Sequence, residues 1–153
     1  IAHGVYATQD TWTDAMFLIH LRCKQAVFSH ETALFLHDLT DREPSAYTIT
    51  VQTGYNPSKL KADGIQVYTI KQELHKEGMI MAQTPFGHTV PVYNMERTIC
   101  DIIRNRSSIE IQTLQNALKY YTSRKDKNLR QLMRYATMFR VEKILRQYLE
   151  VLL

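Results

Sequence analysis

The sequence lacks a long apolar run. Of its 153 residues 44% are hydrophobic, yet no stretch approaches the about 20 consecutive apolar residues that a membrane-spanning helix needs. The most apolar stretch, residues 141–153, is interrupted by charged side chains, namely Glu142, Lys143, Arg146 and Glu150. We therefore expect a protein with no membrane-spanning segment and no membrane partner.

Cysteine is scarce as well. The chain contains only Cys23 and Cys100, and neither forms a CxxC motif or a metal-ligand spacing with histidine. No signal-peptide pattern is present. These features argue against a disulfide scaffold and favour a reducing cytoplasm as the location. A chain of this length buries roughly 68–70% of its unfolded surface, so we expect one compact domain whose core needs no disulfide or metal.

The local motifs of common catalytic sites are also missing. There is no GxGxxG, GxxxxGK(S/T), HExxH or GxSxG, so dinucleotide, P-loop, zinc-protease and nucleophile-elbow enzymes have no local support. Of the six histidines, only His30 and His37 share an expected helix, and a metal would need a third ligand from elsewhere. We predict a protein that is not an enzyme, with no catalytic residue, no cofactor and no metal.

Positive charge is concentrated in the second half. Residues 1–95 hold seven Lys and Arg against nine Asp and Glu, a net charge of −2, and residues 96–153 hold twelve against six, a net charge of +6. Such an excess indicates either the solvated faces of amphipathic helices or a surface for nucleic acid or an acidic partner. The candidate surface residues are Arg124, Lys125, Lys127, Arg130, Arg134 and Arg140.

Two helices are expected at the start of the chain. Residues 12–25 place apolar side chains at helical spacing, with Asp10 or Thr11 as the cap. Residues 29–37 form the second helix, with Ser29 as N-cap. The reciprocal capping box is only partial, because Thr32 stands where Glu or Gln is usual.

Strands are expected in the middle of the chain. Residues 47–53 and 65–70 alternate and are rich in β-branched and aromatic side chains. Residues 79–82 and 89–93 flank a turn and predict a hairpin. Pro91 would then lie on an edge strand or at a bulge, because it cannot donate to a ladder.

Helical periodicity runs from Asn94 to the end. Asn94 can cap a helix from Met95, and three further amphipathic segments follow, in which Tyr121 falls on an apolar face. Helices and strands are therefore segregated along the chain rather than alternating strictly. This order predicts an α+β fold, with a small mixed or antiparallel sheet packed with helices and an all-helical C-terminal part.

Three segments together resemble a known family. They are Gly4-Val5-Tyr6, residues 29–39 (SHETALFLHDL) and residues 96–101 (ERTICD). Their order and spacing around a β segment are similar to the AbiEi family, the antitoxins of bacterial type IV toxin–antitoxin systems that act in abortive infection and phage resistance. The resemblance covers nearly the whole chain.

The resemblance implies a function and a domain organisation. AbiEi proteins carry an N-terminal winged-helix domain that binds inverted repeats in the operon promoter and represses transcription. Their C-terminal domain neutralises an AbiEii nucleotidyltransferase toxin without a stable complex. Residues 1–6 would be the remnant of the wing, and residues 7–153 the antitoxin domain, with an α+β part to residue 95 and a basic helical part from residue 96. DNA contact would come chiefly from the missing domain, with a homodimer on DNA as a further possibility.

The motif residues themselves favour structural roles. Ser29 is placed to accept a backbone N–H at the start of its helix, with His30 beside it. Arg97 and Asp101 are spaced to pair on one helix, with Thr98 beside the apolar face. The alternative is that Arg97, with nearby arginines at positions 104 and 106, forms a phosphate or partner site.

Three hypotheses therefore stand. The first is a non-enzymatic antitoxin domain that works through its surface cations. The second is a nuclease-like nucleic-acid-processing domain, which requires Glu31, Asp63 and Asp101 to lie close together. The third is a dimerisation module of a transcriptional regulator, with the apolar last helix as its interface.

Overall fold

A computed structural model describes residues 14–153. Its centre is a five-stranded sheet of order β3-β2-β1-β5-β4. The sheet is mixed, because β2 pairs parallel with β3, and β1 with β5, whereas the other neighbours are antiparallel. The strands are β1 (Val27–Phe28), β2 (Thr48–Gln52), β3 (Gln66–Ile70), β4 (Met79–Gln83) and β5 (Thr89–Tyr93).

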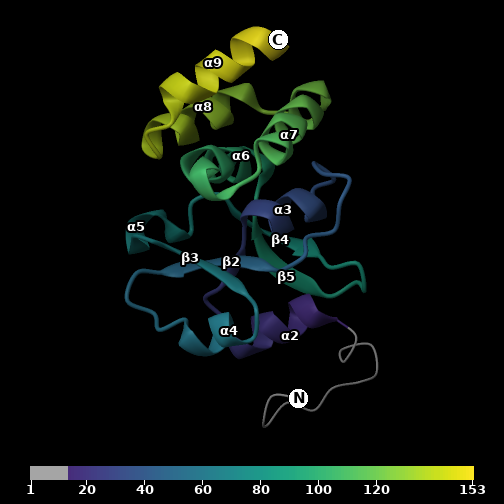
Figure 1. The fold of residues 1–153 in the computed structure, drawn as a ribbon, viewed down its shortest axis with the longest axis vertical. Coiled ribbons are helices and arrows are strands. Elements are labelled where there is room, and N and C mark those ends of the chain that lie inside the picture. The colour runs from purple at the N-terminus through teal and green to yellow at the C-terminus, as the bar shows by residue number, and fades with distance from the viewer. Residues whose placement is uncertain (1–13) are drawn as a thin grey trace.

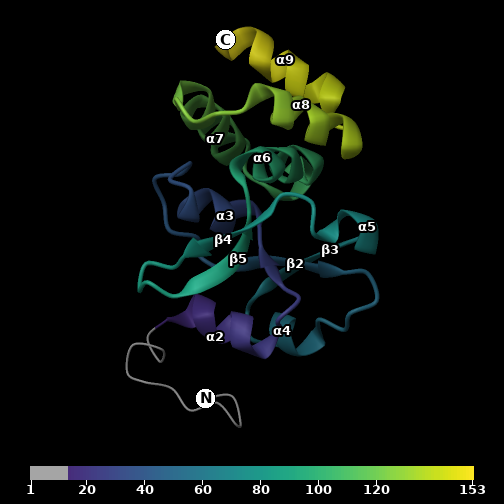
Figure 2. The ribbon, with the colours of Figure 1, turned by 180° about the vertical axis from the view of Figure 1, so that it is seen from behind.

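Helices cover both faces of the sheet, and three more stack on one side (Figures 1 and 2). One face carries α2 (Ala15–Arg22) and α4 (Ser58–Ala62), and the other carries α3 (His30–Leu36) and α6 (Met95–Arg104). The outer layer beyond α6 consists of α7 (Ile111–Ser123), α8 (Leu129–Met138) and α9 (Glu142–Leu152). The short connections are α5 (Gln72–His75) and the 3-10 helix η1 (Arg106–Ser108).

The structure confirms the α+β prediction. The two predicted strands, the hairpin and the four C-terminal helices all form close to their expected bounds. Sequence patterns missed β1, α4 and α5, because two to five residues are too few to show a period. As a result, the first half alternates between strand and helix more than the segregated order had predicted.

The first described helix is shorter than predicted. Asp14 is its N-cap, and the Asp14 Oδ1 atom accepts a bond from the backbone N–H of Phe17 at 3.2 Å. The helix ends at Arg22 because Cys23 adopts an extended backbone. The caps proposed from sequence, Asp10 and Thr11, lie outside the described residues, as does the predicted wing remnant, residues 1–6.

The N-terminus of α3 is capped from a strand rather than by Ser29. Ser29 occupies the N-cap position, but its side chain makes no capping bond. Instead the N–H of Thr32 donates to Thr48 Oγ1 at 3.1 Å, and the N–H of Thr48 donates to Thr32 Oγ1 at 2.8 Å. This reciprocal pair resembles a capping box in which one of the two residues, Thr48, belongs to β2 rather than to the helix. The predicted N-cap position of Ser29 is confirmed, but the predicted hydrogen bond from a backbone N–H to its side chain was wrong, because Thr48 of β2 accepts the N–H of Thr32 instead.

Pro91 does not lie on an edge. Its strand, β5, runs between β1 and β4, and its register with β4 is unbroken, with Pro91 opposite Met81. Both expected placements, an edge strand and a bulge, were wrong. A proline is tolerated here because β1 pairs with β5 only where Phe28 meets Val92, so few N–H donors are needed on that side.

The central element is α6. Every residue of it from Met95 to Ile103 is buried, because the helix lies between the sheet side and the outer helices. Its N-cap is Asn94, as predicted, with the Asn94 Oδ1 atom accepting from Arg97 N at 2.8 Å. Four of the buried side chains are polar, so each must find partners inside the fold. Within residues 14–153 no helix has both the length and the apolarity that crossing a bilayer demands.

Candidate functional site

Arg97 is the largest fully buried side chain of the described residues. Its Nε donates to Asp101 Oδ2 at 3.1 Å, so the pairing predicted from their spacing is observed. Its Nη1 donates to the carbonyl oxygens of Leu74 and Glu77, each at 2.7 Å. Arg97 therefore holds α6 to the segment that joins β3 and β4.

Two aromatic rings face the guanidinium group of Arg97. Its central carbon lies 3.8 Å from the ring centroid of Tyr93 and 4.3 Å from that of Phe139. These rings enclose the cation between β5 and the end of α8 and supply cation–π attraction. Because Arg97 is 0% exposed, it offers no surface to a phosphate. Arg104 is half-buried and Arg106 exposed, so the three arginines do not form one open site.

Gly78 allows α6 to approach the segment between β3 and β4 closely. Its φ is +77°, and a Cβ added there would lie 2.8 Å from the Cβ of Arg97. The carbonyl oxygen of Gly78 accepts the N–H of Asn94 at 2.8 Å. A glycine is required both for the positive φ and for the contact with Arg97.

Glu96 and Thr98 complete the buried motif. Tyr121 Oη donates to Glu96 Oε2 at 2.7 Å, and the N–H of Asn128 donates to the same oxygen at 3.1 Å. Burial and this hydrogen bond to Glu96 raise the pKa of Tyr121. Thr98 Oγ1 donates to the carbonyl oxygen of Tyr93 at 3.3 Å. Glu96 therefore fixes the start of α8 relative to α7, a role for which its sequence context gave no signal.

Ser29 and His30 form the second motif cluster. Thr50 Oγ1 donates to Ser29 Oγ at 2.8 Å, and Ser29 Oγ lies 2.8 Å from His30 Nδ1. On the other side of the ring, His30 Nε2 lies 2.8 Å from Asn105 Oδ1. A neutral imidazole with its hydrogen on Nε2 satisfies both contacts, with the Ser29 hydroxyl donating to Nδ1.

Burial keeps His30 neutral. Removal from water is the main cause that lowers the pKa of His30, and it outweighs the opposing effect of Asp101. The ring stacks on Tyr68 with centroids 3.7 Å apart. His37, the C-cap of α3, bonds instead through Nε2 to the carbonyl oxygen of Tyr93 at 2.8 Å. The two histidines therefore serve separate structural contacts.

Two of the candidate surface cations are tied into the fold. Arg124 donates to the carboxylate of Asp126 at 2.9 and 3.0 Å and to the carbonyl oxygen of His37 at 2.8 Å. Lys127 Nζ donates to the carbonyl oxygen of Arg124 at 3.1 Å. These bonds close the loop between α7 and α8, so Arg124 and Lys127 are less available for a partner than the sequence had indicated.

The other four candidates are exposed and, within residues 14–153, form no ion pair. Arg130 and Arg134 lie one turn apart on α8, and we call these two the α8 cations. Lys125 precedes α8 and Arg140 follows it. Arg134 also lies over the ring of Tyr135, at 5.2 Å. These cations are available for electrostatic contact with a partner.

The carboxylates that a nuclease would need are separated. Asp63, at the end of α4, pairs with Arg22 at 2.8 Å, on the α2 side of the sheet. Asp101 is buried in α6 on the other side, and Glu31 lies in the first turn of α3. Among residues 14–153 no three His, Cys, Asp or Glu side chains are grouped to hold a metal ion. The acid cluster required by the nuclease hypothesis is not formed.

A further polar cluster was not anticipated from sequence. Asp14 Oδ2 accepts hydrogen bonds from Thr84 Oγ1 and from His88 Nδ1, both at 2.6 Å. Phe17 stacks on His88 with centroids 4.3 Å apart. Nucleophilic catalysis would place the imidazole next to the hydroxyl, whereas here both bond to the carboxylate. The cluster ties the hairpin turn to the start of α2.

Comparison with known proteins adds no family. No protein-family model matches the chain, and no curated protein sequence matches it.

We predict that the buried ion pair matters far more than a surface pair of the same spacing. Arg97→Met leaves the buried Asp101 carboxyl group and two carbonyl oxygens without their hydrogen-bond donor, and should lower the free energy of unfolding by about 3–5 kcal/mol. The matched control is Arg146→Met, which breaks the exposed i, i+4 pair with Glu142 and should change the free energy of unfolding far less, because water screens an exposed pair. Urea denaturation measures both, and similar losses would contradict the role given to Arg97.

We also predict that Gly78 is intolerant of a side chain. Gly64→Ala introduces only the strain of a positive φ, about 1–2 kcal/mol, because a Cβ at Gly64 meets nothing within 4 Å. Gly78→Ala adds overpacking against Arg97 and should lose about 1–3 kcal/mol more. Thermal denaturation of the two variants tests the difference, and equal losses would exclude the close contact.

Because the pKa of His30 is lowered below its usual 6.5, the unfolded chain binds a proton more readily than the folded one. Stability should therefore fall as pH drops from about 7 to 5, with His30 contributing up to about 1.4 kcal/mol per pH unit. His30→Asn, which tolerates the φ of 51°, should flatten this slope in urea denaturation. An unchanged slope would refute a neutral His30.

Proposed function

We propose that this chain is the antitoxin domain of a bacterial type IV toxin–antitoxin system of the AbiEi kind, and that it acts without catalysis in the cytoplasm. In the full-length protein it would accompany a winged-helix domain that binds promoter inverted repeats and represses transcription. What supports this proposal is that two of the three resembling segments, residues 29–39 and 96–101, supply contacts that build the fold. Arg97 and Asp101 pair inside, and Ser29 with His30 joins α3 to β2 and to Asn105, just before η1.

The exposed cations on and around α8 are the observation that supports a surface for contact with a partner. Arg130 and Arg134 are exposed and unpaired within residues 14–153, in the half of the chain with a net charge of +6. Phosphates of nucleic acid are the partners that such cations bind without reading sequence. The domain would oppose an AbiEii-like nucleotidyltransferase at its nucleic-acid substrate, which requires no stable complex between the two proteins.

We predict that reversing the α8 cations abolishes neutralisation. The chain would be expressed with an AbiEii-type nucleotidyltransferase and scored by bacterial growth. Arg130→Glu with Arg134→Glu should lose rescue, because the surface would repel phosphates. The matched control is Lys59→Glu with Lys61→Glu, which makes the same charge change on exposed positions of α4, across the sheet, and should keep it.

Two further measurements make this test decisive. Both double variants should retain the wild-type melting temperature, since all four side chains are exposed. Binding to single-stranded RNA and duplex DNA should weaken with salt, and the α8 variant should show a slope that is shallower by about one unit for each phosphate it no longer binds. Full rescue by a folded α8 variant would exclude this surface from antitoxin action.

A further inference from the structure

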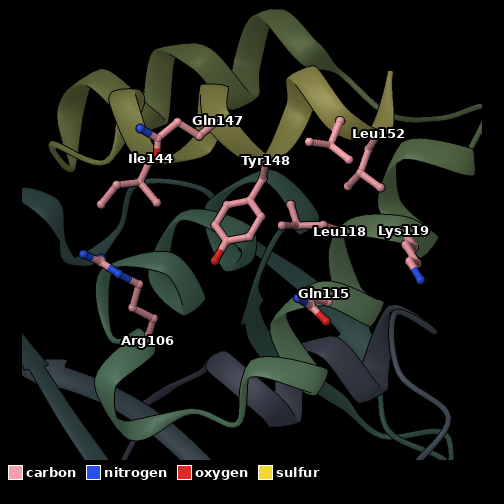
Figure 3. A pocket seen from close by; sticks show the side chains of 9 residues that line it. Arg106, Gln115, Leu118, Lys119, Ile144, Gln147, Tyr148 and Leu152 are labelled. Atoms are coloured by element: carbon pink, nitrogen blue, oxygen red, sulfur yellow. The ribbon is translucent and has the colours of Figure 1, made fainter.

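A groove of about 670 Å³ lies between α7 and α9. Leu118 of α7 faces Ile144, Tyr148 and Leu152 of α9 across it, as Figure 3 shows. The volume falls within the range of sites that bind ligands. The α8 cations do not line this groove, so it is a separate surface from the one proposed above.

The last helix carries more apolar surface than its packing uses. One stripe, Leu145 and Leu149, is buried against the outer core. A second stripe, at i, i+4 and i+8, consists of Ile144, Tyr148 and Leu152, which are only half-buried and line the groove. Beside it Val151 is 84% exposed. Together these side chains are the apolar surface that the groove offers to a partner.

The charges of the groove identify the kind of partner. Among residues 14–153, the charged side chains that line it are Arg106 and Lys119, both cations, and Figure 3 places them on opposite sides of Tyr148. The complement is therefore an apolar strip with acids at both ends. A second copy of this chain that docked through the same groove would bring its own Arg106 and Lys119 against this pair, and the like charges would repel.

We infer that the groove binds an acidic amphipathic helix of a protein partner. Such a helix would lay apolar side chains spaced i, i+3, i+4 and i+7 against Ile144, Tyr148 and Val151 of α9, with the buried Leu118 forming the floor of the groove. Carboxylates at its two ends would meet Arg106 and Lys119. The cations select the partner and speed association, and the apolar strip supplies most of the affinity.

The test uses a designed peptide and this chain. The probe is a fluorescein-labelled helix of about 16 residues, long enough to hold helical structure, with Leu at i, i+3, i+4 and i+7 and Glu at both ends. Fluorescence anisotropy should show binding to the wild-type chain. Arg106→Glu with Lys119→Glu should weaken it at least about tenfold, equivalent to about 1.4 kcal/mol. Val151→Asp should weaken it as well.

Controls separate this groove from general electrostatics. Arg130→Glu with Arg134→Glu makes the same charge change outside the groove and should leave peptide affinity unchanged. A peptide with Lys in place of each Glu should not bind. Since Arg106 Nη1 also donates to the carbonyl oxygen of Ile103 at 2.9 Å, Lys119→Glu alone is the fallback if the double variant melts early.

Several results would overturn the inference. Equal weakening by the α8 variant would show that net charge alone attracts the peptide. Binding of dodecanoate but not of the peptide would assign the groove to a small amphipathic anion. A sedimenting dimer that Val151→Asp converts to monomer would assign it to a second copy of this chain. Absence of peptide binding by the folded wild type would also exclude the proposed partner.

Discussion

Burying a guanidinium group removes its hydration water, which costs free energy unless protein groups take the place of that water. The helical half of this fold is arranged around the groups that do so for Arg97. Asp101, two carbonyl oxygens between β3 and β4, and the rings of Tyr93 and Phe139 meet there. They come from α6, the α5 region, β5 and the end of α8. One side chain therefore sets the position of α6 against the sheet side and against α8. The glycine at position 78 leaves the space that this placement needs.

Much of the fold follows from local pattern. The C-terminal helices show the 3.6-residue period, and α6 begins at the asparagine that the sequence nominates as its cap. The pairing of Arg97 with Asp101 was also predictable, because spacing i, i+4 brings two side chains of one helix together. What local pattern could not show is any partner distant in sequence. Thr48 caps α3 from a strand, and Glu96 bonds to Tyr121 and Asn128 from later in the chain.

Because local pattern does not show partners distant in sequence, it could not tell which of the predicted surface cations are available for a partner. Charge density alone placed Arg124 and Lys127 with the other cations, yet both bond to groups that close the loop between α7 and α8. By contrast, Arg130 and Arg134 follow from helical register, since Leu132 and Tyr135 of α8 are buried on its inner face. A cation in a loop has no register to fix its direction. Its role is decided by acceptors that the tertiary fold brings near.

The outer helices carry two surfaces of different physical character. The α8 cations act at a distance, and their attraction is screened by salt within about 10 Å at 0.1 M ionic strength. The groove between α7 and α9 acts on contact, because apolar burial is short-ranged and largely insensitive to that screening. A polyanion and an acidic amphipathic helix can therefore be held by the same layer without competing for the same side chains. Arg97 and Glu96 connect α6 to α7 and α8 through buried contacts. Exposed side chains of α7 and α8 can therefore be substituted without a change in how these helices pack.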